Sequence, residues 1–130
     1  MREIEFRGKT PEGKWIYGGI SITNDRAWID QGFIGREWFG DTFVDKDTIG
    51  QYTGMKDKNG VKIFEGDILK VHYIGGSENN KVIYDRGTFC VDYSEDYHPL
   101  LNEINHCCEV IGNIWDNGGL VNDSESTKEN

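Results

Sequence analysis

The sequence has 130 residues and a formal net charge of −9. A chain of this length forms one domain, which buries roughly two thirds of the surface that its unfolded chain exposes. The acidic balance argues against nucleic acid as a partner, since DNA is bound largely through neutralisation of its phosphates. No apolar segment approaches the ~20 residues that a membrane-spanning helix needs, which argues against a membrane role.

The apolar residues favour strands. The chain has fourteen Ile and seven Val but only four Leu and one Ala, and β-branched side chains fit a pleated surface better than a helix. Seventeen Gly and two Pro suggest tight turns between short strands. We therefore predict an all-β fold, in which an antiparallel N-terminal meander leads into a small barrel-like sheet with one or two short helices.

Cysteine usage favours a reducing compartment. Cys90, Cys107 and Cys108 form neither an even set nor a spaced disulfide framework. No leader segment, in which charged residues are followed by an apolar stretch, precedes the first predicted strand. Both features predict a cytoplasmic setting.

Residues 1–50 are predicted to form the meander. Polar and apolar residues alternate over residues 2–7, so Ile4 and Phe6 should point inward. Further strands are expected over residues 15–22 and 26–29. Between Phe33 and Val44 the apolar residues are interrupted by glycines, and the pattern does not separate short strands from a helical turn.

Residues 51–117 are predicted to form the barrel-like region. Asn59-Gly60 suits a tight hairpin whose returning strand covers residues 61–64. The next strand, residues 68–74, places Leu69, Val71 and Tyr73 on one face, and a polar loop is expected over residues 75–80.

The remaining elements follow from turn chemistry. A hairpin of residues 82–84 and 88–93 is expected around Gly87, with Phe89, Val91 and Tyr93 toward the core. A short helix suits residues 100–104, because Pro99 precedes apolar residues at helical spacing. The last strand is expected at residues 109–115. Residues 1–117 should thus form a single domain, with a flexible tail over residues 118–130.

Motifs for chemistry are weak. His98, His106, Cys107 and Cys108 crowd together, but adjacent cysteines on a strand point to opposite faces, so no metal site is predicted. Nothing places the thiol of Cys90 or Cys107 beside the imidazole of His72, His98 or His106, as nucleophilic catalysis requires. The glycines match no nucleotide-binding pattern. We expect neither an enzyme nor a cofactor.

A partner surface is the alternative to chemistry. Basic and aromatic residues around the central hairpin and acidic residues that follow it could contact another molecule: Tyr52, Lys56, Lys58, Lys62, Phe64, Asp92, Glu95 and Asp96. Lys70 would extend the basic group. Such a mix can bind single-stranded nucleic acid, although interspersed acids favour an ordinary solvated face. An acidic mimic of nucleic acid, using Asp92, Glu95, Asp96, Glu103 and Glu109, is a further alternative.

The run Gln51-Tyr52-Thr53-Gly54-Met55-Lys56-Asp57-Lys58-Asn59-Gly60-Val61-Lys62-Ile63-Phe64-Glu65-Gly66-Asp67-Ile68 resembles the signature of the YopX family of phage and prophage proteins from Gram-positive bacteria. The opening Met1–Arg7 and the segment Glu109–Asn117 also resemble that family. The chain departs from the family pattern in three places. Gly8 stands where alanine is usual and Met55 where leucine is usual, and Gly118-Gly119 stand where a Pro-Glu type of continuation is common.

The resemblance implies a mostly β fold, a phage or prophage gene and a host cytoplasmic setting, and it implies no activity. The residues themselves indicate a structural role for the signature, because Asp57, Asn59 and Asp67 can bond backbone amides in its turns. We therefore predict a non-catalytic accessory protein that binds another protein or copies of itself as a homo-oligomer, since many short strands leave edges that must be paired or blunted.

Overall fold

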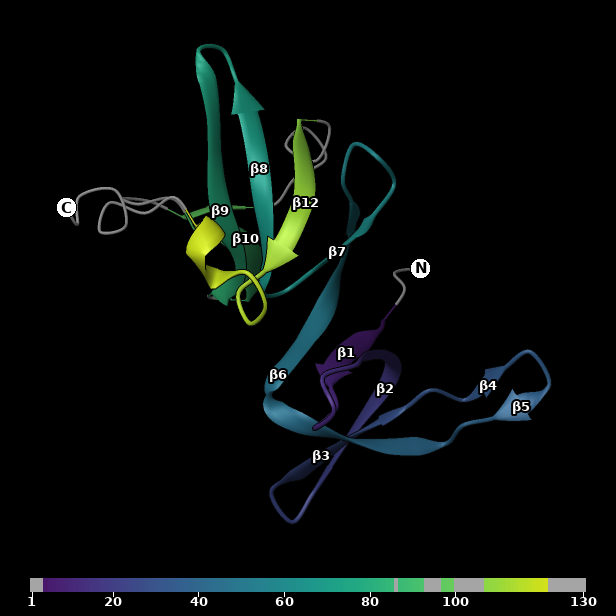
Figure 1. Cartoon of the computed structure of the whole chain (residues 1–130). Helices are drawn as coiled ribbons and strands as arrows, with labels where there is room; N and C mark the ends of the chain where they lie inside the picture. The colour runs from purple at the N-terminus through teal and green to yellow at the C-terminus, as the bar shows by residue number, and fades with distance from the viewer. Residues whose placement is uncertain (1–3, 86, 93–96, 100–106, 122–130) are drawn as a thin grey trace. The chain divides into compact units, whose positions relative to one another are not determined.

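The computed structural model describes residues 4–85, 87–92, 97–99 and 107–121 (Figure 1). The strands are β1 (Phe6–Lys9), β2 (Trp15–Thr23), β3 (Arg26–Asp30), β4 (Phe33–Ile34), β5 (Glu37–Trp38), β6 (Asp41–Lys56), β7 (Lys62–Phe64), β8 (Asp67–Tyr73), β9 (Gly76–Asp85), β10 (Thr88–Asp92), β11 (Tyr97–Pro99) and β12 (Cys108–Asn113). A 3-10 helix covers Gly118–Leu120. The pairings are antiparallel, which confirms the predicted all-β class. In the part of the chain described, no helix is long and apolar enough to cross a membrane.

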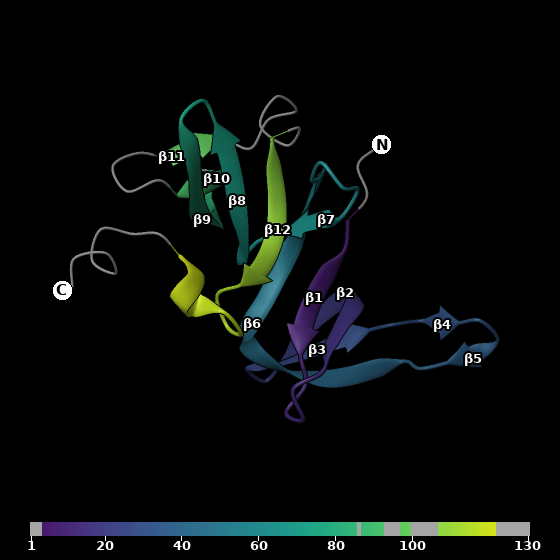
Figure 2. The same cartoon turned by 45° about the horizontal axis from the view of Figure 1, so that its top comes forward.

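The chain divides into two compact units, Met1–Tyr52 and Thr53–Asn130. In the first unit, β1 pairs with β2, β2 with β3, β3 with β6, and β6 again with β1, so the four strands form a ring. The closure depends on the length and bend of β6, which pairs with β3 through Asp41–Val44 and with β1 from Asp45 to Gln51 (Figures 1 and 2). One bent strand therefore supplies two sides of the ring.

The core of the first unit is small. Ile16, Ala27, Ile29 and Val44 are buried, and Phe6 and Ile49 pack against them. The prediction of an inward Ile4 is wrong, because this residue precedes β1 and is exposed. The segment Phe33–Val44, whose pattern did not separate short strands from a helical turn, contains β4, β5 and the first residues of β6. Among the described strands, β4 and β5 form a two-stranded sheet of their own.

The second unit contains a five-stranded sheet in the order β11-β10-β9-β8-β12. Its core is formed by Ile63, Leu69, Val71, Val82, Val91 and Cys108. The predicted hairpin at Gly87 is confirmed: β9 and β10 pair from Asp85↔Thr88 onward, and Gly87 has a φ of 84°. Tyr93 and the predicted helix at residues 100–104 lie outside the described residues.

The expected polar loop at residues 75–80 is wrong. Residues 76–80 belong to β9 and pair with β8, in register from Tyr73↔Gly76 to Leu69↔Asn80. Gly75, with a φ of 101°, turns the chain directly back after Ile74. Their polar composition suggested a loop, but a neighbouring strand satisfies their backbone groups equally well. Asn80 is buried in this arrangement.

Candidate functional site

Asp57 is the centre of the hairpin between β6 and β7. Its Oδ1 accepts hydrogen bonds from the backbone N–H groups of Asn59 (2.8 Å) and Val61 (2.9 Å). Its Oδ2 accepts one from the N–H of Val110 on β12 (2.8 Å), 53 residues further along the chain. The side chain is buried. One carboxylate thus closes the turn and attaches β12 to it.

Other residues of the same run also hold the backbone. The hydroxyl of Thr53 donates to the carbonyl of Ile63 at 2.8 Å, and Asp67 Oδ2 accepts from the N–H of Phe64 at 2.7 Å. Gly66, with a φ of 92°, lies beneath Trp115, whose ring would be 2.3 Å from an added Cβ. The prediction that Asp57 and Asp67 accept hydrogen bonds from backbone amides in the turns is confirmed, and the role of these bonds is to hold the fold.

The structure does not bring the predicted partner surface together on the outside of the protein. Tyr52 and Phe64 are buried, so their rings are not available to a partner in this conformation. Lys56 and Lys58 are exposed, and Lys62 is half-buried. The aromatic part of the predicted patch is therefore missing from the surface.

The charged residues of that patch are partly neutralised. Lys58 Nζ lies 3.4 Å from Glu109 Oε1, and Lys70 stands opposite Glu109 in the β8–β12 register. Asp92 is 3.7 Å from Lys81 Nζ. Acidic partners interrupt the basic group, as expected for a solvated face. Glu95, Asp96 and Glu103 lie outside the described residues.

The cysteines have the environment of structural thiols. Cys90 and Cys108 are buried, and all three cysteines are free. Burial is the main cause that raises the pKa of Cys108 to about 12, and it also raises the pKa of Cys90. A high thiol pKa lowers the thiolate fraction and hence nucleophilicity at neutral pH. No group of three or more metal-ligating side chains occurs among the described residues, which do not include His106 or the side chain of His98.

A second feature, which sequence analysis missed, is the arm, defined here as residues 32–39: the hairpin β4–β5 with Gly32 and Phe39 at its base. Phe33 pairs with Trp38 and Ile34 with Glu37, and Gly35 turns the chain with a φ of 67°. The exposed fractions of its apolar side chains are 71% for Phe33, 54% for Ile34, 64% for Trp38 and 44% for Phe39. Figure 1 shows the arm projecting beyond β3 and β6.

Hydrogen bonds order the base of the arm. The N–H of Phe39 donates to the carbonyl of Gly32 at 2.8 Å, and the N–H of Gln31 donates to that of Gly40 at 3.1 Å. Two-residue strands carry no periodicity, so the sequence signal was limited to apolar residues between glycines. An isolated two-stranded hairpin is marginal in water, and four exposed apolar side chains on it are a signal of an interaction surface.

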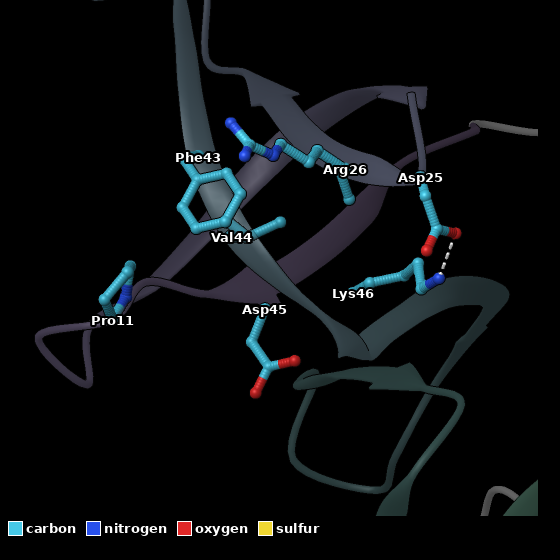
Figure 3. Close-up of a pocket in the computed structure, with 8 residues that line it drawn as sticks. Pro11, Asp25, Arg26, Phe43, Val44, Asp45 and Lys46 are labelled. Atoms are coloured by element: carbon cyan, nitrogen blue, oxygen red, sulfur yellow. Dashed lines mark hydrogen bonds and ion pairs between the residues drawn. The ribbon is translucent and has the colours of Figure 1, made fainter. Parts of the chain in front are cut away.

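The first unit also holds a pocket of about 290 Å³ (Figure 3). Ala27 and Val44, which are fully buried in the small core, are among its lining residues. Figure 3 shows Lys46 bonded to Asp25 on one side and Asp45 across Val44 from Phe43. The full lining is Pro11, Asp25, Arg26, Ala27, Phe43, Val44, Asp45 and Lys46. A pocket of this size, with charged groups of both signs around it, can accept one large side chain.

Comparison with known proteins gives a family and a fold. The sequence pattern of the family described as YopX protein matches residues 5–122. No curated protein matches the chain. The crystal structure of protein EF1440 from Enterococcus faecalis is similar, with a TM-score of 0.57 and 24% identity, covering 91% of this chain and 97% of that one. This likeness supports the fold alone. The family match spans most of the sequence, and the chain belongs to the YopX family.

Proposed function

We propose that this chain is a phage or prophage accessory protein of the host cytoplasm that acts without catalysis, by assembling with copies of itself through the β4–β5 arm. The observation that carries the proposal is the exposure of Phe33, Ile34, Trp38 and Phe39 on one projecting hairpin. Apolar patches of this kind mark interaction sites, and aromatic side chains provide much of the binding energy at such sites.

Two further observations support a binding role over chemistry, and a third supports the proposed location. The thiols Cys90 and Cys108 are buried with raised pKa values. In the family signature, residues 51–68, Asp57 uses its side chain to bind backbone N–H groups and so supports the fold rather than a ligand pocket. The three free cysteines suit a reducing compartment.

The test is the oligomeric state in solution. Sedimentation velocity over a range of concentrations should show association of the wild-type protein, and the double variant Phe33→Ser with Trp38→Ser should sediment as a monomer. Ile22→Ser is the matched control, because Ile22 belongs to the same unit and is 59% exposed outside the arm. A wild-type protein that stays monomeric to about 1 mM would contradict self-assembly, since weaker association has little free energy.

A further inference from the structure

We propose that the pocket of the first unit receives the side chain of Phe33 from the arm of a second copy, so that the chain assembles head to tail. This inference rests on the proposed function and adds the receiving surface. The pocket measures about 290 Å³. Pockets for drug-sized ligands span about 300–1,000 Å³, so this one suits a single large side chain.

The arm presents such a side chain. Phe33 and Trp38 form a cross-strand pair and therefore share a face of the hairpin. The ring of Trp38 packs over Gly40 of its own chain, where an added Cβ would be 2.9 Å from it. Phe33 has the larger exposed fraction, 71%. Its ring would meet Phe43 in the pocket, and aromatic pairs gain energy beyond their buried area.

Both surfaces carry charged groups of both signs that would pair on docking. In the arm, Arg36 lies in the turn and Glu37 follows it as the first residue of β5. The pocket carries Arg26 and Asp45, in addition to the Asp25–Lys46 pair. Within the described residues, none of Arg26, Arg36, Glu37 and Asp45 forms an ion pair. Docking would place Arg36 near Asp45 and Glu37 near Arg26, so that each charge of the arm gains a partner of opposite sign.

The pocket cannot be filled by the arm of the same chain. Arg26 and Ala27 begin β3, whereas the arm continues from Asp30, at the other end of β3. The Phe39–Gly32 hydrogen bond closes the base of the arm at that other end, and Figure 1 shows the arm projecting from there. The donor and acceptor surfaces differ, so the contact is heterologous, and it builds a ring or an open filament rather than a two-fold dimer.

Electrostatics favour contacts between first units. Residues 1–52 carry seven Lys/Arg and nine Asp/Glu, whereas residues 53–130 carry seven and fourteen. Repulsion between like-charged copies is therefore smallest when the first units meet.

The experiment uses one donor-defective and one acceptor-defective full-length variant. Phe33→Ser removes the inserted ring, and the double variant Arg26→Glu with Asp45→Arg reverses the charges of the pocket at constant net charge. Each alone should associate at least about 10-fold more weakly than wild type, the first because it loses a buried aromatic side chain and the second because like charges would face each other across the contact. Mixed in equal amounts, they should form a 1:1 heterodimer and nothing larger, because together they offer one intact arm and one intact pocket.

A charge control is the swap Lys81→Asp with Asp92→Lys, which keeps both the net charge and the ion pair of the second unit and should associate like wild type. Circular dichroism verifies that each variant is folded. If the pocket variant assembles like wild type while Phe33→Ser does not, the arm acts elsewhere; the inference fails and the proposed function stands. If wild type itself is monomeric, both fail.

Discussion

The two units differ in where they place the residues that stand out in each of them. The second unit directs them inward: Asp57 joins three backbone amides, and Gly66 lies against Trp115. The first unit directs them outward, on the arm and around the pocket. The part of the sequence most typical of the family therefore serves mainly to build the second unit. The arm proposed for binding comes from the segment with the weakest sequence pattern, residues 33–44.

The largest expected effect comes from breaking the centre of the second unit. Asp57→Ala leaves the N–H groups of Asn59, Val61 and Val110 without their acceptor. Each of these partly buried hydrogen bonds contributes about 1–1.5 kcal/mol, so the loss of all three should lower the free energy of unfolding by about 3–5 kcal/mol in urea titrations. The comparison is Asp30→Ala, which removes one exposed bond to the N–H of Gly32 and should cost less than about 1 kcal/mol. Equal losses would contradict the central role of Asp57.

The next effect separates packing from backbone strain. Gly60 and Gly66 both have positive φ, but an added Cβ meets nothing within 4 Å at Gly60 and meets the Trp115 ring at 2.3 Å at Gly66. Gly60→Ala should cost about 1–2 kcal/mol from the left-handed conformation alone. Gly66→Ala should cost about 3–4 kcal/mol, measured by the same unfolding titration.

The excess at Gly66 depends on the indole. In the double variant Gly66→Ala with Trp115→Ala, the loss should therefore be smaller than the sum of the single losses. Strict additivity would show that the ring does not press on this turn in solution.

These residues also show how far sequence reasoning reaches. The Asn59-Gly60 and Gly87 hairpins were predictable because turn chemistry is local. The Asp57 to Val110 bond was not, since nothing local relates positions 53 residues apart. Burial of Tyr52 and Phe64 was missed because aromatic residues beside lysines suit a surface as well as a core. The arm was missed because two strands of two residues have no period, and the pocket because its lining comes from three separate segments.

A smaller effect concerns the buried thiol of the second unit. Because the pKa of Cys108 is about 12 in the folded protein and near 8.5 in an unfolded chain, the unfolded state loses this proton first as pH rises. The free energy of unfolding should then fall between about pH 9 and 11 more steeply in wild type than in Cys108→Ala. Parallel curves would mean that the thiol is not buried in solution. Below pH 8 the two curves should run parallel, since the thiol is protonated in both states.

The smallest effect sharpens the description of the first unit. The side-chain hydrogen bond from Lys46, with the charge of that lysine, lowers the pKa of Asp25, although both groups are hydrated. Carbon-detected NMR titration of the double variant Phe33→Ser with Trp38→Ser, which should be monomeric, should place the pKa of Asp25 below its ordinary value. Lys46→Ala should return it to that value, whereas Lys14→Ala should not. High salt should also reduce the shift, because exposed ion pairs are screened. If the pKa of Asp25 stays low without Lys46, another cationic group must lie beside Asp25 at this edge of the pocket. The Asp25–Lys46 ion pair would then not be what holds the Asp25 carboxylate in place in the monomer.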